Sequence, residues 1–299
     1  MKKCLIDCSD ASAGLGDIII IMPYLEKFQQ VHNMIVHFKV KRKNWASLFS
    51  KSYPNIVFIT DEDYKDDYDK KIFLTHTDHT KSLQRIFAEQ LGFHNAEYIR
   101  PKVDLPKTER KIKSRYVCIS THSTAQLKFW NSTKGFVDQL EPSNWNELCS
   151  ILRKNGITPV CIDYHESFGV TPFYNYVPKK SVKKLGLSLE DVLGYMEHCE
   201  FFIGLSSGMA WLAHAAGKPV CMISNFTEDW YEFDLSCKDY IRITNKNVCH
   251  GCWNLVGKEY KYDNADWYWC LKHKDTDRQF ECHKSISPTD VYEKIKIWI

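Results

Sequence analysis

The sequence predicts an α/β protein in which two doubly wound parallel sheets follow one another along the chain. Segments typical of strands alternate with segments typical of helices, which is the pattern of a parallel sheet covered on both faces. The alternation stops at residues 101–114, a charged, proline-bearing stretch, and then starts again. The length of 299 residues suffices for two domains, and we expect them to span residues 1–110 and 111–299.

The elements of the first half follow from the order of apolar and polar segments. A short apolar strand precedes a glycine-containing loop, and an isoleucine-rich helix follows that loop. Three further strands and a second helix complete this half. We expect strands at residues 4–8, 34–40, 55–60 and 71–75, and helices at residues 18–31 and 81–91.

The second half repeats the alternation of strands and helices. We expect strands at residues 116–120, 158–163, 200–204 and 219–224, and helices at residues 142–154, 189–198 and 207–216. Ligands of such folds bind at the carboxyl ends of the strands, beside helix N-termini. A cleft between the two sheets is therefore the expected location of a site.

Composition limits the function classes. The chain is 44% apolar and 14% aromatic, which is enough for a buried core, and its formal charge of +3 neither requires nor excludes a nucleic-acid partner. No run approaches 18 apolar residues, so no membrane span is expected. Eight of the twelve cysteines lie singly in apolar or mixed segments, and no secretory leader is visible. These features favour a reducing cytoplasm.

Four cysteines near the C-terminus have the spacing of a metal site. They form a C-x2-C pair followed by two single cysteines: Cys249, Cys252, Cys270 and Cys282. Such a pair presents two thiolates from one turn, and two later thiolates complete a tetrahedral shell. The alternatives are two disulfides or four unrelated core cysteines. The spacing favours zinc, with iron second, and three nearby histidines could replace a ligand: His250, His273 and His283.

The first loop that could carry chemistry is Gly14-Leu15-Gly16-Asp17, between the first strand and the first helix. Gly14 and Gly16 let the backbone approach a ligand closely, and a helix N-terminus favours negative charge. The full G-x-G-x-x-G fingerprint of dinucleotide-binding proteins is absent. Asp17 is either a cap of the helix or a general base that takes a proton from an acceptor hydroxyl.

Two further loops could bind a diphosphate, which requires hydrogen-bond donors and a cation. Ser123, Thr124 and Lys128 follow the strand at 116–120, although Ser, Thr and Lys are ordinary loop residues. A second group joins a later strand to a helix that is rich in small residues: Ser206, Ser207 and Gly208. This second group could bind an anion at a helix N-terminus, or it could supply a plain serine N-cap.

Taken in order, these segments resemble one family, the bacterial autotransporter heptosyltransferases. These TibC-like glycosyltransferases are related to the lipopolysaccharide heptosyltransferases of glycosyltransferase family 9. The resemblance rests on GLGD, HSTAQLKFWN, FIGLSSGMAWLAHAAGKPVCMIS, the C-x2-C-W motif and RQFEC. It covers nearly the whole chain and is densest over residues 116–282.

The resemblance implies a GT-B fold, two Rossmann-like domains facing a cleft, with a C-terminal four-cysteine finger that binds iron. It implies a donor such as ADP-heptose, bound mainly by the C-terminal domain, and transfer of the sugar to an acceptor hydroxyl on a protein. By motif, Asp17 matches the catalytic base and Lys128 a pyrophosphate contact. The other matches are Ser123 and Thr124 for the pyrophosphate, Ser206, Ser207 and Gly208 for the loop that closes on the nucleotide, and Cys249, Cys252, Cys270 and Cys282 for the metal.

One departure leaves the acceptor and the oligomeric state open. Protein-modifying relatives carry a small β-barrel domain before the first Rossmann strand, whereas this chain begins at that strand. A phage-type enzyme that glycosylates hydroxymethylated DNA bases is the alternative. A non-catalytic protein of the same shape, either an inactive scaffold or a nucleic-acid-binding module, is an alternative of another class. The module would stack bases on aromatic residues of the finger: Trp253, Trp267, Tyr268 and Trp269.

Overall fold

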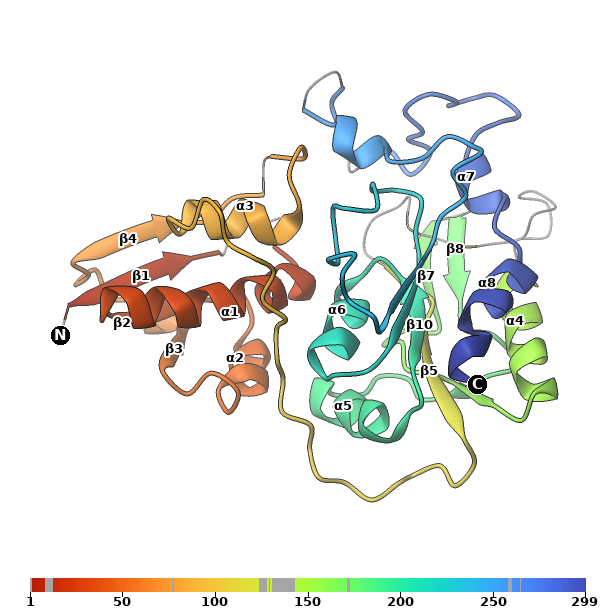
Figure 1. Ribbon diagram of the computed structural model, residues 1–299, viewed down its shortest axis with the longest axis horizontal. Coiled ribbons are helices and arrows are strands. Elements are labelled where there is room, and N and C mark those ends of the chain that lie inside the picture. The colour runs from red at the N-terminus through yellow and green to blue at the C-terminus, as the bar shows by residue number, and fades with distance from the viewer. Residues whose placement is uncertain are drawn as a thin grey trace.

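The structure, a computed structural model, describes residues 2–8, 13–76, 78–123, 128, 130, 143–170, 173–257, 260–263 and 265–299. Two parallel sheets divide it into an N-terminal half and a C-terminal half, which Figure 1 shows at the left and the right. The prediction of an α/β protein with two parallel sheets is confirmed.

The N-terminal half has a four-stranded parallel sheet in the order β3-β2-β1-β4. Its strands are β1 (Lys3–Asp7), β2 (Ile35–Lys39), β3 (Ile56–Ile59) and β4 (Lys70–Phe73), and its helices are α1 (Leu15–His32), α2 (Lys43–Phe49) and α3 (Leu83–Gln90). The neighbouring strands β1 and β4 are parallel, so their carboxyl ends lie at one edge of the sheet. Residues that follow these two strands therefore come together there.

The C-terminal half has a six-stranded parallel sheet in the order β12-β11-β10-β5-β6-β9. Its strands are β5 (Tyr116–Ser120), β6 (Thr158–Cys161), β9 (Val182–Lys183), β10 (Phe202–Leu205), β11 (Val220–Ile223) and β12 (Tyr240–Ile243). Its helices are α4 (Ser143–Lys154), α5 (Leu189–His198), α6 (Gly208–Ala215), α7 (Glu281–Lys284) and α8 (Pro288–Ile295). The loops after β5 and β10 leave neighbouring strands at the same edge.

Several helices and strands of the structure lie outside the ranges that the sequence predicts. These are α2, β9, β12, α7, α8 and an antiparallel hairpin of β7 (Ser167–Val170) and β8 (Phe173–Tyr176). Strand β12 is only four residues long and contains the charged residue Arg242, so its sequence resembles that of a surface loop. Helix α8 has a readable start signal, because Pro288 opens the helix and the Ser287 hydroxyl accepts from the Asp290 amide at 3.1 Å.

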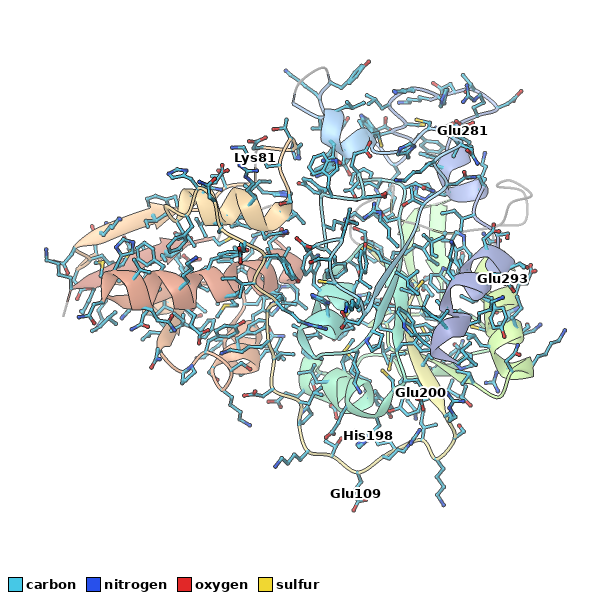
Figure 2. All side chains as sticks on the ribbon, in the orientation of Figure 1. Lys81, Glu109, His198, Glu200, Glu281 and Glu293 are labelled. Atoms are coloured by element: carbon cyan, nitrogen blue, oxygen red, sulfur yellow. The ribbon has the colours of Figure 1, made fainter. Side chains whose placement is uncertain are left out.

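The connecting segment, residues 101–114, has no helix or strand but is attached to α5. The backbone amide and the hydroxyl of Thr108 both donate to a carboxylate oxygen of Glu197, each at 2.8 Å. The ring Nε2 of His198 lies 2.7 Å from the Thr108 carbonyl oxygen. Figure 2 shows Glu109 and His198 close together at the bottom of the molecule, where the segment passes α5.

The two halves share a hydrophobic core. The first turns of α1 are buried on every side, from Ile18 to Leu25, because the helix packs on its own sheet and also on α6. The backbone amide of Val103 donates to the Ala215 carbonyl at 3.0 Å and joins the connecting segment to the end of α6. In the described part of the chain, no helix combines the length and the apolarity that crossing a membrane requires.

Candidate active site and metal centre

The two glycine-containing turns meet where the halves join. A Cβ atom on Gly16 would lie 3.0 Å from Trp211 Cδ1 and 3.5 Å from the Gly208 Cα. A Cβ atom on Gly208 would lie 3.0 Å from the Leu15 Cβ and 3.1 Å from the Gly16 backbone nitrogen. Gly16 and Gly208 therefore allow the N-termini of α1 and α6 to touch. That Gly14 and Gly16 also let a ligand approach the backbone stays a prediction, and Gly16 in addition contacts the opposite helix.

Asp17 lies in the first turn of α1 and is half-buried. Its Oδ2 accepts a hydrogen bond from the Gly14 amide at 2.8 Å, so the capping contact that was one of its two interpretations is present. Its negative charge also acts on neighbours from both halves, because it opposes the lowering of the pKa of His76 and of Lys128. Asp17 therefore faces a cluster of polar groups between the halves.

Lys128 follows β5 and is partly buried. Its Nζ lies 5.5 Å from the centre of the Phe226 ring. Burial lowers the pKa of Lys128, and the carboxylates of Glu232 and Asp17 oppose this shift. The ammonium group thus lies within electrostatic reach of both a C-terminal and an N-terminal carboxylate, at the place where the sequence analysis expected a cation for a diphosphate.

The loops after β5 and β10 are joined to each other. The Ser123 hydroxyl donates to the Ser206 carbonyl oxygen at 3.3 Å. The Ser206 hydroxyl is 1% exposed and donates to Glu232, so it is already engaged within the protein. Ser207 is the N-cap residue of α6, and its buried Oγ has no hydrogen-bond partner among the described residues. Of the two serines, Ser207 is therefore the better candidate for a ligand contact. Thr124 lies outside the described residues.

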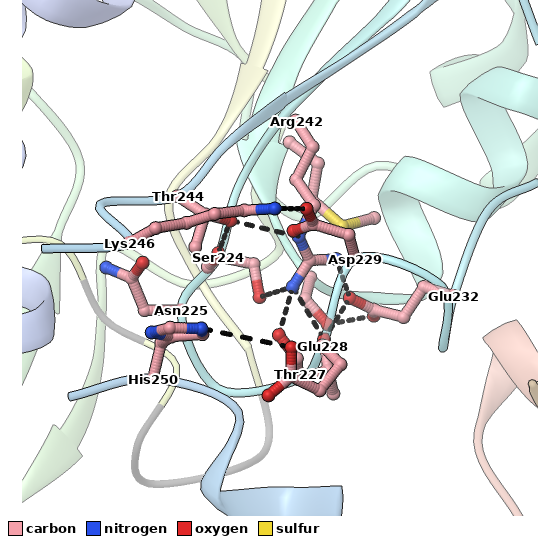
Figure 3. A network of polar contacts seen from close by, with 12 residues as sticks. Ser224, Asn225, Thr227, Glu228, Asp229, Glu232, Arg242, Thr244, Lys246 and His250 are labelled. Carbon is pink, nitrogen blue, oxygen red and sulfur yellow. Dashed lines mark hydrogen bonds and ion pairs between the residues drawn. The ribbon is translucent and has the colours of Figure 1, made fainter. Parts of the chain in front are cut away.

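A buried ion pair that the sequence analysis missed supports this loop. Glu232 and Arg242 have side chains only 4% and 5% exposed, and Arg242 Nη1 lies 3.0 Å from Glu232 Oε2. Arg242 also donates to the Thr227 carbonyl at 2.6 Å and to the Ser224 hydroxyl at 3.3 Å, which Figure 3 shows around the guanidinium group. Charged residues are usually exposed, so Glu232 in a loop and Arg242 in a short strand look like surface residues in the sequence. The sequence therefore gives no sign that they form a buried pair.

The charges around Glu232 favour the ionised form of its carboxyl group. Burial alone raises the pKa of Glu232, but the Arg242 and Lys128 cations bring it below its ordinary value. The Thr227 hydroxyl donates to Glu232 Oε2 at 2.8 Å and adds to the effect. The network fixes Ser206 and places a negative charge near Lys128.

His76 is a second residue that the sequence analysis missed. It lies just after β4, at the edge of the N-terminal sheet where β1 also ends, and its Nε2 lies 2.8 Å from the Tyr231 hydroxyl of the C-terminal half. Burial lowers the pKa of His76, Asp17 opposes the shift, and Lys128 adds to it. The polar run after the strand at 71–75 was the available signal.

The four finger cysteines line one small cavity. Its volume is about 20 Å³, which is room for one ion or one water molecule, and apolar Phe226, Leu271 and Phe280 complete the wall. The cysteines are Cys249, Cys252, Cys270 and Cys282, with His250 and His283 also at the wall. None of the twelve cysteines forms a disulfide, so the two-disulfide alternative finds no support.

The donor set of four thiols at one cavity fits a thiophilic metal ion. In the described ranges, no group of three or more His, Cys, Asp or Glu side chains is already arranged to hold a metal ion. Burial raises the pKa of Cys252 to about 12, and the nearby Cys249 and Cys270 add to the shift. A metal ion must therefore displace protons from these thiols when it binds.

The finger aromatics belong mostly to its own core. Trp269 is 8% exposed and packs in one cluster with Phe226 and Phe280, and Trp253 packs against that cluster. Tyr268 is 43% exposed. The stacking surface that a nucleic-acid-binding module needs is thus largely consumed by packing inside the finger.

Known proteins resemble the chain over most of its length. It is 35% identical to the autotransporter heptosyltransferase Aah of Escherichia coli, over 93% of this chain and 70% of that protein. It is 26% identical to BimC of Burkholderia thailandensis, named an inactive autotransporter heptosyltransferase, over 94% of the chain and 66% of that protein. No protein-family model matches the chain.

The structure also resembles crystal structures of TibC from enterotoxigenic E. coli H10407. The TM-score is 0.86 at 28% identity, over 99% of this chain and 76% of that one. TibC is described as an iron-containing, dodecameric glycosyltransferase, and a second crystal contains it in complex with ADP-D-β-D-heptose. The fold expected from the sequence, two facing α/β units, is therefore confirmed by a known relative as well as by the strand order.

Proposed function

Because this chain belongs to the autotransporter heptosyltransferase family, we propose that it transfers a heptose from ADP-heptose to a hydroxyl group of a protein. One structural observation carries the proposal. The N-termini of α1, which carries Asp17, and of α6 touch where the halves join, and Lys128 follows β5, the strand next to the one that precedes α6. A base from one half and a cation from the other are the groups that sugar transfer from a nucleotide diphosphate needs.

The C-terminal half holds the donor in this proposal. The ammonium group of Lys128 and the N-terminus of α6 attract the diphosphate oxygens. Ser207 contributes its hydroxyl, which has no partner among the described residues. Ser123, Ser206 and Gly208 shape this site, since Ser206 is already bonded to Glu232 and Gly208 permits the close helix contact.

The reaction then balances as a single displacement. The acceptor hydroxyl gives its proton to the Asp17 carboxylate, and its oxygen forms a bond to the anomeric carbon of the heptose. The bond between that carbon and the diphosphate oxygen breaks, and the electron pair leaves with ADP. Lys128 stabilises the charge that develops on the leaving group.

The four cysteines hold one structural metal ion, which we propose to be iron, with zinc as the other candidate. Three points support this: the shared cavity, the four-sulfur donor set, and the iron content of TibC. When bound, the ion supplies only cross-linking of the finger, because four thiolates leave no position for a substrate.

We further propose that the protein acts in the bacterial cytoplasm, that its two halves correspond to domains 1–110 and 111–299, and that it can form oligomers. Twelve free cysteines and a thiolate metal site suit a reducing compartment. TibC is dodecameric, which motivates the oligomer.

A transfer assay tests the function directly. The purified protein is incubated with ADP-heptose and one of two acceptors, an autotransporter passenger protein or hydroxymethylated DNA, and the mass of the acceptor is measured. An added mass of one heptose on the protein supports the proposal. Addition of heptose to DNA alone supports the phage-type alternative. If ADP-heptose is not consumed with either acceptor, the results contradict both the protein-modifying and the DNA-modifying function. BimC, named inactive, shows why turnover must be measured.

A further inference from the structure

The turn of the finger that carries Cys252 is fastened to the N-terminal half. Asn254 donates through Nδ2 to the His79 carbonyl oxygen at 2.7 Å, and Trp253 and His79 pack edge to face with ring centres 4.5 Å apart. Asn254 is 7% and His79 is 9% exposed, so these contacts are shielded from water. In Figure 1 the finger lies at the top, beside the loop that follows β4.

Tyr231 extends this connection to His76. Its hydroxyl oxygen lies 3.1 Å from Trp253 Nε1 and 2.8 Å from His76 Nε2. The backbone on both sides is joined as well, because the Leu83 amide donates to the Tyr231 carbonyl at 2.8 Å. We call Tyr231, Trp253 and Asn254, with His76 and His79, the clasp.

The clasp determines which nitrogen of His76 carries the proton. An indole N–H can only donate, so Tyr231 accepts from Trp253. Tyr231 is 1% exposed, and its own O–H would be left buried without an acceptor unless it donated to His76. Nε2 of His76 is then the acceptor, and the neutral imidazole keeps its proton on Nδ1.

His76 also lies near the reacting groups. It follows β4 at the same sheet edge from which α1 and Asp17 arise. The charge of Asp17 and that of Lys128 both act on the ring. An N–H donor of fixed orientation that binds a lone pair of the acceptor hydroxyl oxygen holds this oxygen in place and directs its O–H toward the Asp17 carboxylate.

We propose that His76 donates its Nδ1–H to the acceptor oxygen during transfer, and that Tyr231 and the finger residue Trp253 are positioning residues that fix its ring. This inference rests on the proposed function. It gives the finger a second role, because the metal-bound turn would hold a substrate-contacting side chain in place across the two halves.

Substitutions of His76 separate its two nitrogens. Asn places its amide N–H near the position of Nδ1, whereas Gln places its amide near Nε2. His76→Ala and His76→Gln should lower kcat by about tenfold to a hundredfold. His76→Asn should stay within about threefold of wild type. The KM for ADP-heptose should change little in all three variants. Equal kcat values for the Asn and Gln variants, or a wild-type kcat for His76→Ala, would overturn the proposal.

Tyr231→Phe tests the positioning role. In the wild-type background it should lower kcat about three- to tenfold, because His76 loses the bond that fixes its ring. In the His76→Asn background the same change should leave kcat unaltered, because the shorter asparagine side chain has no atom in the place of Nε2. An equal loss in both backgrounds would show that Tyr231 acts only on the fold.

A readout without activity tests the link to the metal. Iron is removed with a chelator, and hydrogen exchange is compared for residues 78–83 and for α2 as a control. Residues 78–83 should exchange faster after removal, while α2 should not change. Unaltered exchange at residues 78–83 would contradict the role of the finger. Wild-type protein that transfers no heptose would refute the proposed function itself, whereas normal wild-type transfer with fully active His76 variants would refute only this inference.

Discussion

Asp17 can combine the two tasks that its sequence position suggested. One oxygen of the carboxylate, Oδ2, accepts from the Gly14 amide at 2.8 Å and caps α1. A carboxylate has a second oxygen, which remains able to take a proton. The cap also fixes the orientation of the side chain, so the structural role supports the catalytic one. Ser206 and Ser207 divide two tasks between them. The Ser206 hydroxyl donates to Glu232, whereas the Ser207 hydroxyl has no partner among the described residues and can bind a ligand.

Replacement of Asp17 by Asn separates these tasks. Asn keeps an oxygen for the Gly14 amide but cannot accept a proton at neutral pH. Heptose transfer in a single turnover should fall by about 10²-fold or more. The unfolding free energy should fall by at most about 1 kcal/mol, and ADP binding should persist. Near-normal transfer would leave Asp17 a helix cap only.

Lys128→Ala should weaken donor binding. It removes one charge-assisted contact, of order 1.5–3 kcal/mol, so the Kd for ADP measured by calorimetry should rise about tenfold to a hundredfold. Lys296→Ala is the matched control, because Lys296 is 53% exposed and pairs with Glu293 on the distant helix α8. If both variants bind ADP equally well, Lys128 does not contact the diphosphate.

At the scale of elements, the crossing of α1 and α6 explains why glycines occupy both turns. Each helix begins after a central strand of its own sheet, and the two N-termini touch. Two helix N-termini that touch place two positive dipole ends side by side. Such an arrangement favours an anion between the halves, which suits a diphosphate donor.

Gly208→Ala should disturb this crossing. The added Cβ would lie 3.0 Å from the Leu15 Cβ and 3.1 Å from the Gly16 nitrogen, so the helices must move apart. We expect a loss of about 1–3 kcal/mol in the free energy of unfolding, measured with urea. Gly14→Ala is the control from the same loop, because its Cβ would meet only Asp17 Oδ2 at 3.6 Å. Equal stability of the two variants would show that the crossing tolerates a methyl group.

The connection between β11 and β12 makes stability depend on pH. The pKa of Glu232 lies below its ordinary value in the folded protein, so its contribution to stability is complete above that ordinary value, about 4.3. The contribution is lost as the pH falls through the lowered, folded-state pKa. Glu232→Gln removes one of the two carboxylates that pair with Arg242, since Asp229 Oδ1 remains 3.3 Å from Arg242 Nε, and should cost about 1.5–3 kcal/mol near pH 7.

The difference in unfolding free energy between wild type and Glu232→Gln should shrink as the pH falls below about 4, because protonation removes the same charge from the wild type. Urea unfolding at pH 7, 5 and 3.5 measures it. A constant difference across this range would mean that Glu232 does not titrate as the folded contacts indicate.

At the scale of the whole molecule, the finger contributes both to the stability of the protein and to the contact between the two halves. Cys270→Ser should remove one of four metal ligands, lower the metal content and reduce the melting temperature. Cys237→Ser is the control, since Cys237 lies outside the cavity of the finger. Metal analysis and thermal unfolding measure both effects. An iron–thiolate site should also colour the wild-type protein red-brown. Full metal content in Cys270→Ser would contradict the shared four-ligand site.

The sequence by itself determined the features that depend on neighbours along the chain. The alternation of strand-like and helix-like segments predicted two parallel sheets and located most strands, including the one at residues 116–120. The C-x2-C spacing pointed to the finger, and the family motifs pointed to Asp17 and Lys128. These are local patterns, which a chain displays whatever its tertiary partners are.

Only the tertiary structure decided which distant residues meet. Gly16 touches Gly208, Glu232 pairs with Arg242, and His76 bonds to Tyr231 because the order of the strands brings their ends together. A buried ion pair and a buried histidine look like ordinary surface residues in a sequence, since hydropathy reports the residue and not its partner. Which side chains contact one another depends on how the chain packs, both within each half and between the halves. The periodic pattern of apolar residues along the sequence does not contain this information.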